Sequence, residues 1–422
     1  MKGEKILFVI PWLPYPFKSG GHQALFNGIA AVSDNYDIYI TYTATDNAEY
    51  CRDEKEFLKK IPRAHLFPLL IKKNNLQIFF SKVKRLIKKI VCIKEEIPDK
   101  EECISIRWIK SILPLQKMWL DHISTICDEY HFDIIQVEMP LLISQILTLP
   151  CDCKRIYVHH ELGFVCRSLE MQMIHNTSHI QACKSFADMV EVDLLNMYDA
   201  ILTLSSIDKR KLLTQGVSTP IFTSFSTIEM SKIKASIIGN GKHLTFIGAD
   251  YHIPNLLGIK WFLVNCWSKL RNIDEGYRLS IIGEWSSDNI KDIQSKYKNI
   301  EFQGFVDDLE TAIKGTIMIV PITIGSGIRM KILEACSIGV PFVSTSIGAE
   351  GIPVNDGENC FIADTPNSFL EKIQKLRDVT IQQKFVDNAY EMVQTKYSRK
   401  ALTENRLEIY KAIKHGQKNH SH

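Results

Sequence analysis

A glycine-rich turn at residues 325–327 is followed at once by two cations and a carboxylate, Arg329, Lys331 and Glu334. The turn separates an apolar, β-branched run from a helical pattern, which places the cations in the first turn of a helix. Backbone N–H groups, the helix dipole and a cationic side chain all attract an anion there. A carboxylate one turn further on repels phosphate but accepts hydrogen bonds from a diol such as that of ribose. The combination indicates a nucleotide.

A plainer interpretation exists for two of these residues. Lys331 and Glu334 are three positions apart and are therefore neighbours on a helix surface. A solvated ion pair of this kind stabilises a helix by at most about half a kcal/mol. Two common nucleotide motifs are missing, because the turn at 325–327 lacks the third glycine of a dinucleotide fingerprint and no GxxxxGK[ST] loop occurs. This argues against a P-loop nucleoside triphosphatase and an NAD dehydrogenase.

A second glycine turn follows the first strand-like run of the chain, in the segment "PYPFKSGGHQALF". It brings Gly20 and Gly21 to the start of a helix, where exposed amides suit an anion. The plainer alternative is a tight turn from strand to helix without a ligand.

Five further candidates stand at two strand ends or just beyond them. The run "IIQVEMP" ends near Glu138, and "RIYVHHELGF" ends near His159, His160 and Glu161, with Arg167 following. Adjacent positions on a strand point to opposite faces, so one metal ion held by both histidines is not expected. Either histidine could instead be a hydrogen-bonded core residue.

Short apolar runs alternate with helical patterns along the whole chain, which is typical of parallel sheets covered on both faces. Two sets of runs predict two doubly wound α/β domains, residues 1–230 and 231–397, with a C-terminal helix over 398–415 that packs back on the first domain. Ligands of such sheets bind beyond the carboxyl ends of the strands, where the residues above lie. The predicted strands are in KILFVIPWLP, YDIYITYT, HLFPLLI, FDIIQVEMP, KRIYVHHE, AILTLSS, PIFTSFS, HLTFIGAD, RLSIIGEW, IEFQGFV, TIMIVPIT, VPFVSTSIG and CFIAD.

Composition narrows the class of protein. A chain of 422 residues is too long for one ordinary core, which agrees with two domains. The net charge of +3 gives no argument for nucleic acid as a partner. Eleven cysteines without CxxC pairs, no secretory signal pattern and no apolar run of roughly 20 residues predict a cytoplasmic protein.

Residues 77–94, "QIFFSKVKRLIKKIVCIK", form a basic amphipathic pattern. Apolar residues share one helical face, and lysines and an arginine occupy the other. Such helices often lie on membrane surfaces, where each basic residue contributes roughly 1 kcal/mol next to anionic lipid. The pattern predicts contact with the inner leaflet, and the alternative is a helix packed on its own sheet with a solvated basic face.

The segment "GSGIRMKILEACSIGVPFVSTSIGAEGI" resembles the donor-binding signature of GT-B glycosyltransferases of the GT4 type, most of all a bacterial polysaccharide-biosynthesis branch. The resemblance extends through "FIGADYHIPNLLGIKWFL", "LSIIGEW", "FQGFVDDL" and the N-terminal "PYPFKSGGHQALF". It implies two Rossmann-like domains facing each other across a cleft. The sugar nucleotide would occupy the C-terminal domain and the acceptor the N-terminal one.

The resemblance also implies roles for single residues. Glu334 matches the glutamate that binds the ribose hydroxyls, and Gly20 and Gly21 match the loop that approaches the diphosphate and donor sugar. Phe305 and Val306 match the loop beside the nucleobase.

A histidine near the donor sugar and the acceptor is also implied. His160 is favoured, with His159 as the alternative, and Glu138, Glu161 and Arg167 are acceptor-side candidates.

The sequence departs from the common family pattern at two places. Ser326, next to Gly327 in the turn, replaces a glutamate that usually contacts the donor sugar. The usual Arg and Lys after the first C-terminal strand are missing, so Arg329 and Lys331 are predicted to neutralise the diphosphate.

The function that follows is transfer of a sugar from a nucleoside diphosphate, UDP or GDP, to a glycan or lipid-linked saccharide. The resemblance implies retention of anomeric configuration, no tightly bound cofactor, no essential metal and a role in bacterial surface polysaccharide synthesis, in the cytoplasm or on the inner face of its membrane. The alternatives are a sugar-nucleotide epimerase of the same fold, an inactive nucleotide-binding partner, and a structural protein that uses only the basic helix.

Overall fold

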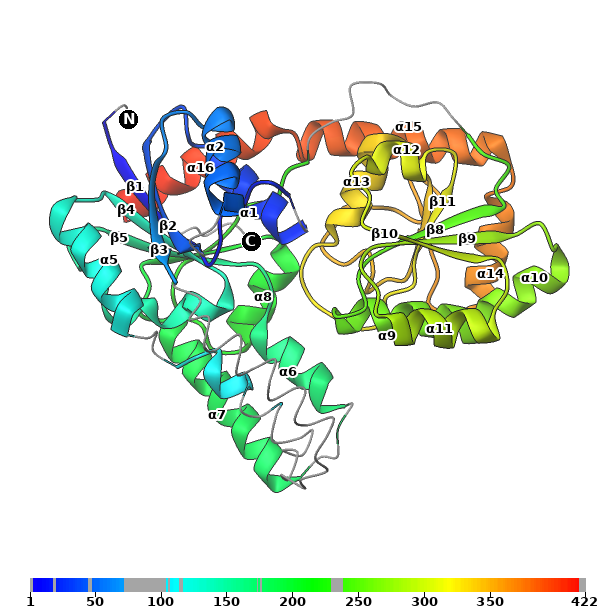
Figure 1. Ribbon diagram of the computed structural model, residues 1–422, viewed down its shortest axis with the longest axis horizontal. Coiled ribbons are helices and arrows are strands. Elements are labelled where there is room, and N and C mark those ends of the chain that lie inside the picture. Colours follow the sequence, from blue (N-terminus) through cyan, green and yellow to red (C-terminus); the bar gives the residue numbers. More distant parts are fainter. Residues whose placement is uncertain are drawn as a thin grey trace. The chain divides into compact units, whose positions relative to one another are not determined.

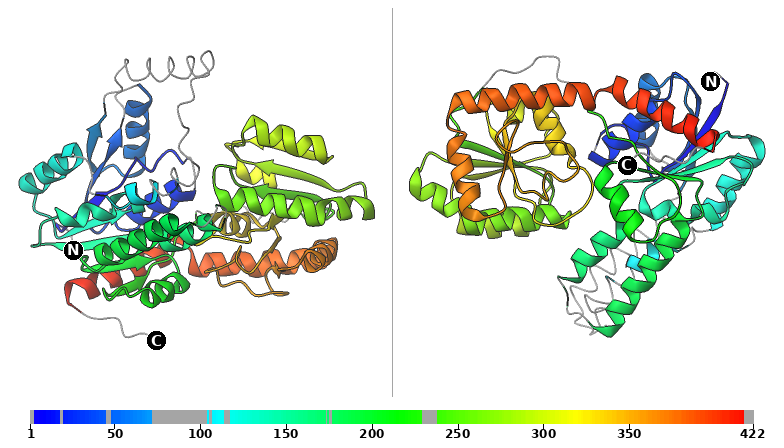
Figure 2. Two further views of the ribbon diagram at one scale, coloured as in Figure 1. Left: turned by 90° about the horizontal axis from the view of Figure 1, so that it is seen from below. Right: turned by 180° about the vertical axis from the view of Figure 1, so that it is seen from behind.

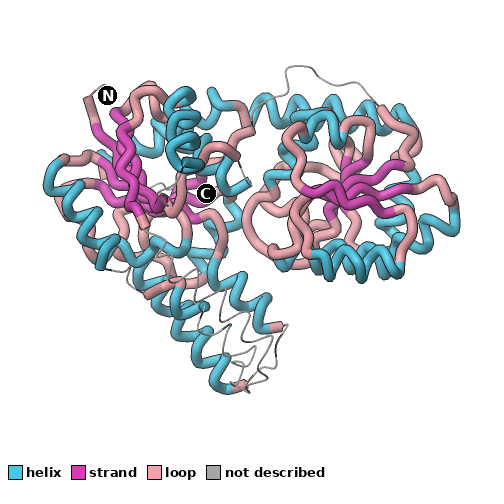
Figure 3. The backbone as a smooth tube through the Cα atoms, viewed as in Figure 1, coloured by secondary structure: helices cyan, strands magenta, loops and turns pink. Residues whose placement is uncertain are grey.

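The chain divides into two compact units, residues 1–224 with 403–422 and residues 225–402. In each of them the strands form an inner layer between helices (Figure 3). Residues 77–94 lie outside the described residues, so the structure does not bear on the predicted membrane helix. Among the helices that are described, none is both long and apolar enough to cross a membrane. The computed structural model describes residues 3–17, 20–44, 48–71, 104, 107–113, 117–172, 174, 177–228 and 238–416.

The N-terminal unit contains a parallel sheet of seven strands in the order β3-β2-β1-β4-β5-β6-β7 (Figure 1). The strand order reverses between β1 and β4, which makes the carboxyl ends of these two strands the switch point of the sheet. The strands are β1 Lys5–Val9, β2 Asp37–Ala44, β3 His65–Leu70, β4 Ile134–Glu138, β5 Lys154–His159, β6 Ala200–Thr203 and β7 Ile221–Thr223; the helices are α1 Gly20–Ala30, α2 Ala48–Lys60, α5 Lys117–Glu129, η1 Pro140–Leu147, α6 Gly163–Met171, α7 Ser178–Leu195, α8 Ser206–Thr214 and α16 Arg399–Lys414.

Alternate residues of β4 face opposite sides of this sheet. Ile135 and Val137 pack in a cluster with side chains of α5, η1, α7 and α8. Gln136 and Glu138 face the other way, and the Tyr410 hydroxyl of α16 reaches Gln136 there. Figures 1 and 2 show α16 beside α1. The side chains of Tyr36, which follows α1, and of Tyr410 meet edge to face there.

The C-terminal unit contains a parallel sheet of six strands in the order β10-β9-β8-β11-β12-β13. Its switch point lies between β8 and β11. Helices α9 and α11 cover one face, and α13 and α15 cover the other (Figure 1). The strands are β8 His243–Ile247, β9 Arg278–Ile282, β10 Ile300–Gly304, β11 Ile317–Val320, β12 Phe342–Ser344 and β13 Phe361–Ile362; the helices are α9 Ile253–Phe262, η2 Leu263–Trp267, α10 Ser268–Ile273, α11 Ser287–Lys296, α12 Leu309–Ile313, α13 Met330–Ile338, α14 Pro366–Lys375 and α15 Val379–Lys396.

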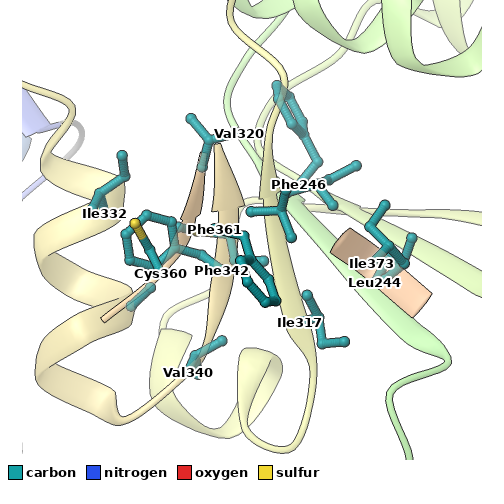
Figure 4. Close-up of a cluster of buried hydrophobic side chains, with 14 of the residues drawn as sticks. Leu244, Phe246, Ile317, Val320, Ile332, Val340, Phe342, Cys360, Phe361 and Ile373 are labelled. Atoms are coloured by element: carbon teal, nitrogen blue, oxygen red, sulfur yellow. The ribbon is translucent and has the colours of Figure 1, made fainter. Parts of the chain in front are cut away.

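Helix α13 is fixed by its buried face and by its ends. Ile332 is fully buried in one cluster with Phe246 of β8 and Val320 of β11 (Figure 4). The helix begins after Arg329 and ends at Gly339, whose φ of 84° is left-handed and whose N–H returns to the Ala335 carbonyl. The first turn of α13 is thereby held at the carboxyl end of β11.

Every strand predicted from the sequence is present, and both sheets are parallel and covered by helices, which confirms the predicted fold class. The C-terminal helix also has its predicted apolar face, since Leu402, Ile409, Tyr410 and Ile413 are all buried. The N-terminal unit includes this helix from Thr403 onward.

Candidate functional site

The glycine turn before α13 folds tightly around one arginine. Gly325 and Gly327 have φ values of 131° and 79°, in the region that favours glycine. A Cβ added at Gly325 would lie 2.5 Å from Nη2 of Arg329. The Arg329 guanidinium is buried and donates through Nη1 to the carbonyls of Ser326 and Gly327, the latter at 2.7 Å. Arg329 therefore fixes the shape of the loop in which the buried Ser326 stands.

Lys331 turns towards the end of β8, across the switch point. Its Nζ donates to the Ile247 carbonyl and, at 2.8 Å, to Oδ1 of Asn255, and it lies 4.8 Å from the centre of the Phe246 ring. In the described part of the chain no ion pair joins it to Glu334, so the structure does not show the plain surface pair. The ammonium has three N–H donors, and these two bonds leave one for a ligand.

Glu334 is a partly exposed carboxylate one turn further along α13. No hydrogen bond to its side chain is found within the described ranges. Burial raises the pKa of Glu334 to about 7, although Lys331 opposes the rise. Burial lowers the pKa of Lys331 to about 7, Arg329 adds to the effect, and Glu334 opposes it. A desolvated carboxylate without a protein donor suits a ligand that brings hydroxyl groups.

These two pKa values predict a pH dependence of stability. The Glu334 contribution is present below its ordinary pKa of 4.5 and is lost as pH rises through about 7. The Lys331 contribution is present above 10.5 and is lost as pH falls through about 7. Between pH 5 and pH 7.5 we expect the melting temperature of Glu334→Gln to fall less than that of the wild type. Each kcal/mol of difference in the free energy of unfolding corresponds to roughly 2–4 °C. Solvent screening of the exposed part reduces the effect. Differential scanning fluorimetry over this range measures it, and parallel curves for the two proteins would contradict it.

Two neighbouring loops complete the carboxyl edge of this sheet. Asp250, after β8, accepts hydrogen bonds from Ser286 and Asn289 at the start of α11. Beyond β10, Phe305 is 58% exposed, whereas Val306 packs against the core of the unit. An exposed aromatic ring at this edge is available to a planar ligand group.

In the N-terminal unit the structure brings His160 and Glu138 together. Nε2 of His160 lies 2.7 Å from Oε2 of Glu138, which is buried at the end of β4. His159 is buried and faces other residues, with Nε2 3.3 Å from Oε1 of Glu191. The two histidines thus have different partners, as strand alternation predicts.

Arg167 belongs to the charge cluster around His159. Its guanidinium pairs with Glu191 and, at 2.6 Å, with Oδ1 of Asp188. Burial alone would raise the pKa of Glu191, but His159 and Arg167 hold it below its ordinary value. Arg167 and Glu161 both line a cavity of about 180 Å³ in this unit. Two of the three acceptor-side candidates, Glu161 and Arg167, therefore share one cavity.

Gly20 and Gly21 are the first two residues of α1 and are partly exposed. Their position after β1 leaves their amides at the carboxyl edge of the N-terminal sheet. Within the described ranges no three His, Cys, Asp or Glu side chains are grouped to hold a metal ion.

Sequence reasoning missed two residues of these sites. Asn255 holds Lys331, and its side chain fills the space beside Gly248, where an added Cβ would lie 2.5 Å away. Gln136 donates to Glu138 from within β4. Both carried a signal in the sequence, since each is a polar residue in an otherwise apolar stretch.

Comparison with known proteins gives a family match in the C-terminal unit. Residues 241–378, which include the glycine turn and all of α13, match the family model of glycosyl transferases group 1. The match lies within the C-terminal unit and covers most of it. An uncharacterised 44.6 kDa protein of the cps region of Klebsiella pneumoniae is 27% identical over 169 residues, which are 38% of this chain and 44% of that protein. The chain thus matches less than half the length of this curated relative.

Three solved structures share the fold over nearly the whole chain. S. aureus TarM, in a complex with UDP, has a TM-score of 0.68 at 13% identity and covers 96% of this chain and 99% of its own. Sucrose-phosphate synthase of Thermosynechococcus elongatus has a TM-score of 0.68 at 13% identity, and the match covers 98% of this chain and 100% of that one. Anabaena HepE in complex with UDP-glucose has a TM-score of 0.63 at 13% identity, and the match covers 97% of this chain and 99% of that one. At these identities the likeness shows the fold, which is GT-B.

Proposed function

We propose that the protein is a glycosyltransferase that moves a hexose from a nucleoside diphosphate to a glycan or lipid-linked acceptor. The proposal includes retention of anomeric configuration and a role in bacterial surface polysaccharide synthesis. The observation that carries it is the start of α13, where Arg329 and Lys331 precede a carboxylate, Glu334, that has no hydrogen-bond donor in the described chain. The group 1 family match over these residues supports it. Complexes of TarM with UDP and of HepE with UDP-glucose support the donor class, and the cps-region relative supports the polysaccharide context.

In this proposal a few groups bind the donor and assist the transfer. Glu334 would accept hydrogen bonds from the ribose hydroxyls, and Phe305 with Val306 would flank the base. The remaining N–H of Lys331 and the amides at the start of α13 would stabilise negative charge on the leaving diphosphate, with Arg329 holding the loop. Gly20, Gly21 and His160 would act from the N-terminal unit.

The test begins with thermal shift of the full chain against UDP- and GDP-sugars, because a ligand that binds the folded protein raises its apparent melting temperature, and a tighter ligand raises it more at the same concentration. The stabilising donor is then incubated with saccharide and lipid-linked acceptors in the presence of EDTA. We expect a glycosylated product that retains the donor's anomeric configuration, formed without added metal. Epimerised donor without acceptor would favour the epimerase alternative, and binding without hydrolysis or transfer would favour an inactive partner. Membrane contact through residues 77–94 remains a prediction from the sequence.

A further inference from the structure

A chain of buried hydrogen bonds connects the C-terminal helix to His160. The Tyr410 hydroxyl and Nη1 of Arg406, both on α16, lie 2.5 and 3.4 Å from Oε1 of Gln136. Nε2 of Gln136 lies 2.5 Å from Oε1 of Glu138, whose other oxygen meets His160. Gln136, Glu138, Arg406 and Tyr410 are each at most 3% exposed. The four side chains therefore act on one another without competition from water.

The donors on α16 fix which way the Gln136 amide points. An arginine has only donors, so the oxygen of the amide must face Arg406. The Nε2 group is then left to donate to Glu138. The reverse orientation would set two donors against each other and an amide oxygen against a carboxylate. The donors on α16 thus determine the donor-to-acceptor direction of every hydrogen bond between α16 and Glu138.

The direction of these hydrogen bonds also determines which nitrogen of the His160 imidazole carries the proton. Glu138 accepts one bond from Gln136 and offers its second oxygen to Nε2 of the histidine, so this nitrogen carries the proton. In the neutral ring the lone pair then resides on Nδ1. A histidine held in one tautomer by a carboxylate presents one defined nitrogen to a reacting group, as in the triad of serine proteases.

Helix α16 is held on the N-terminal unit by contacts at several points. Thr403 Oγ1 donates to the Ala31 carbonyl at 2.9 Å, and Asn405 Nδ2 lies 3.4 Å from the Thr223 carbonyl. Lys414 pairs with Glu4 at the other end of the helix. These contacts fix the position of α16 along its own axis, and so place the Tyr410 hydroxyl beside Gln136.

We propose that Gln136 is a positioning residue, and that α16 sets the orientation and tautomer of His160 through Gln136 and Glu138. For its effect on transfer this inference rests on the proposed function, because it concerns the histidine expected beside the donor sugar. The tautomer itself does not depend on that function and can be measured in the unliganded protein.

The experiment measures the ring nitrogens of His160 by ¹⁵N NMR in the full chain, with the signal assigned by its loss in His160→Asn. The wild type is expected to show a protonated Nε2 and an unprotonated Nδ1. Gln136→Leu frees the Glu138 carboxylate to turn away from the ring and is therefore expected to give a mixture of tautomers. Tyr410→Phe removes one of the two α16 donors to Gln136 and is expected to give a smaller share of the second tautomer. Both variants should also lower kcat about tenfold, the effect of one hydrogen bond, and leave KM for the donor within about twofold. Tyr410→Phe keeps the ring beside Tyr36 and carries the test if Gln136→Leu does not fold.

Tyr198→Phe is the matched control, because its buried hydroxyl donates at 2.8 Å to the Ile143 carbonyl in the same unit and does not touch Gln136. It should lower the melting temperature without changing the tautomer. An unchanged His160 tautomer in both Gln136→Leu and Tyr410→Phe would overturn the proposal. Mixed tautomers with undiminished transfer would support the positioning role of Gln136 while contradicting the role of His160 in the proposed function.

Discussion

Replacing Lys331 by methionine is expected to lower kcat for sugar transfer by about 10²–10³-fold. The ammonium is held by the Ile247 carbonyl and Asn255 at the switch point of the C-terminal sheet, so it does not have to reorganise when a diphosphate leaves. A preorganised donor at developing negative charge contributes on this scale in other enzymes. Methionine keeps the length and the contact with Phe246 but removes the charge. Steady-state kinetics with the stabilising nucleotide sugar measure the effect.

Lys372→Met is a matched control for this variant. Lys372 lies in the same unit, donates to a strand carbonyl at Ile362 and to Oδ2 of Asp356, and approaches the Phe361 ring at 5.7 Å. Its loss should cost similar stability and leave kcat unchanged. Equal turnover in Lys331→Met and the control would show that Lys331 only joins α13 to β8.

The fold could be predicted because parallel strands covered on both faces are apolar throughout. Runs such as "TIMIVPIT" contain no polar face, and β11 within it is fully buried. Helix α13 could be predicted in the same way, from the helical pattern that follows the glycine turn at 325–327. These signals are local, and each can be read within about a dozen residues.

The directions of the site side chains could not be predicted, because partners distant in sequence set them. Lys331 and Glu334 are neighbours by spacing, yet the lysine turns to Asn255, 76 positions earlier. Gln136 gave no hint of Tyr410, which is 274 positions away. Alternation along a strand did separate His159 from His160. Only the structure shows that His159 lies beside Glu191 and His160 beside Glu138.

Ser326 raises a separate question about the donor sugar. It is buried in the loop, and its carbonyl accepts a hydrogen bond from Arg329. A glutamate at this position would add a carboxylate, besides that of Glu334, to the loop that folds around the Arg329 guanidinium. The prediction that follows is that residues other than Ser326 recognise the donor sugar.

Replacing Glu334 is expected to weaken donor binding more than any other single change. Hydrogen bonds to a charged group contribute about 1.5–3 kcal/mol each, so Glu334→Leu should raise the donor Kd by at least about tenfold and by about 10²-fold if both ribose hydroxyls bind. Glu334→Gln keeps one acceptor and should give a smaller increase. Isothermal titration calorimetry with the nucleotide sugar measures both.

The pH dependence of this affinity separates Glu334 from Lys331. Glu334 must be ionised and Lys331 protonated, and the pKa of each is about 7, so donor affinity in the wild type should be highest near neutral pH. Glu334→Gln should remove the loss of affinity on the acid side, and Lys331→Met the loss on the alkaline side. Glu371→Gln, which removes an exposed partner of Lys375 in the same unit, should alter neither. An unchanged Kd in Glu334→Leu would mean that the ribose is bound elsewhere, and the assignment of α13 as the donor site would then fall.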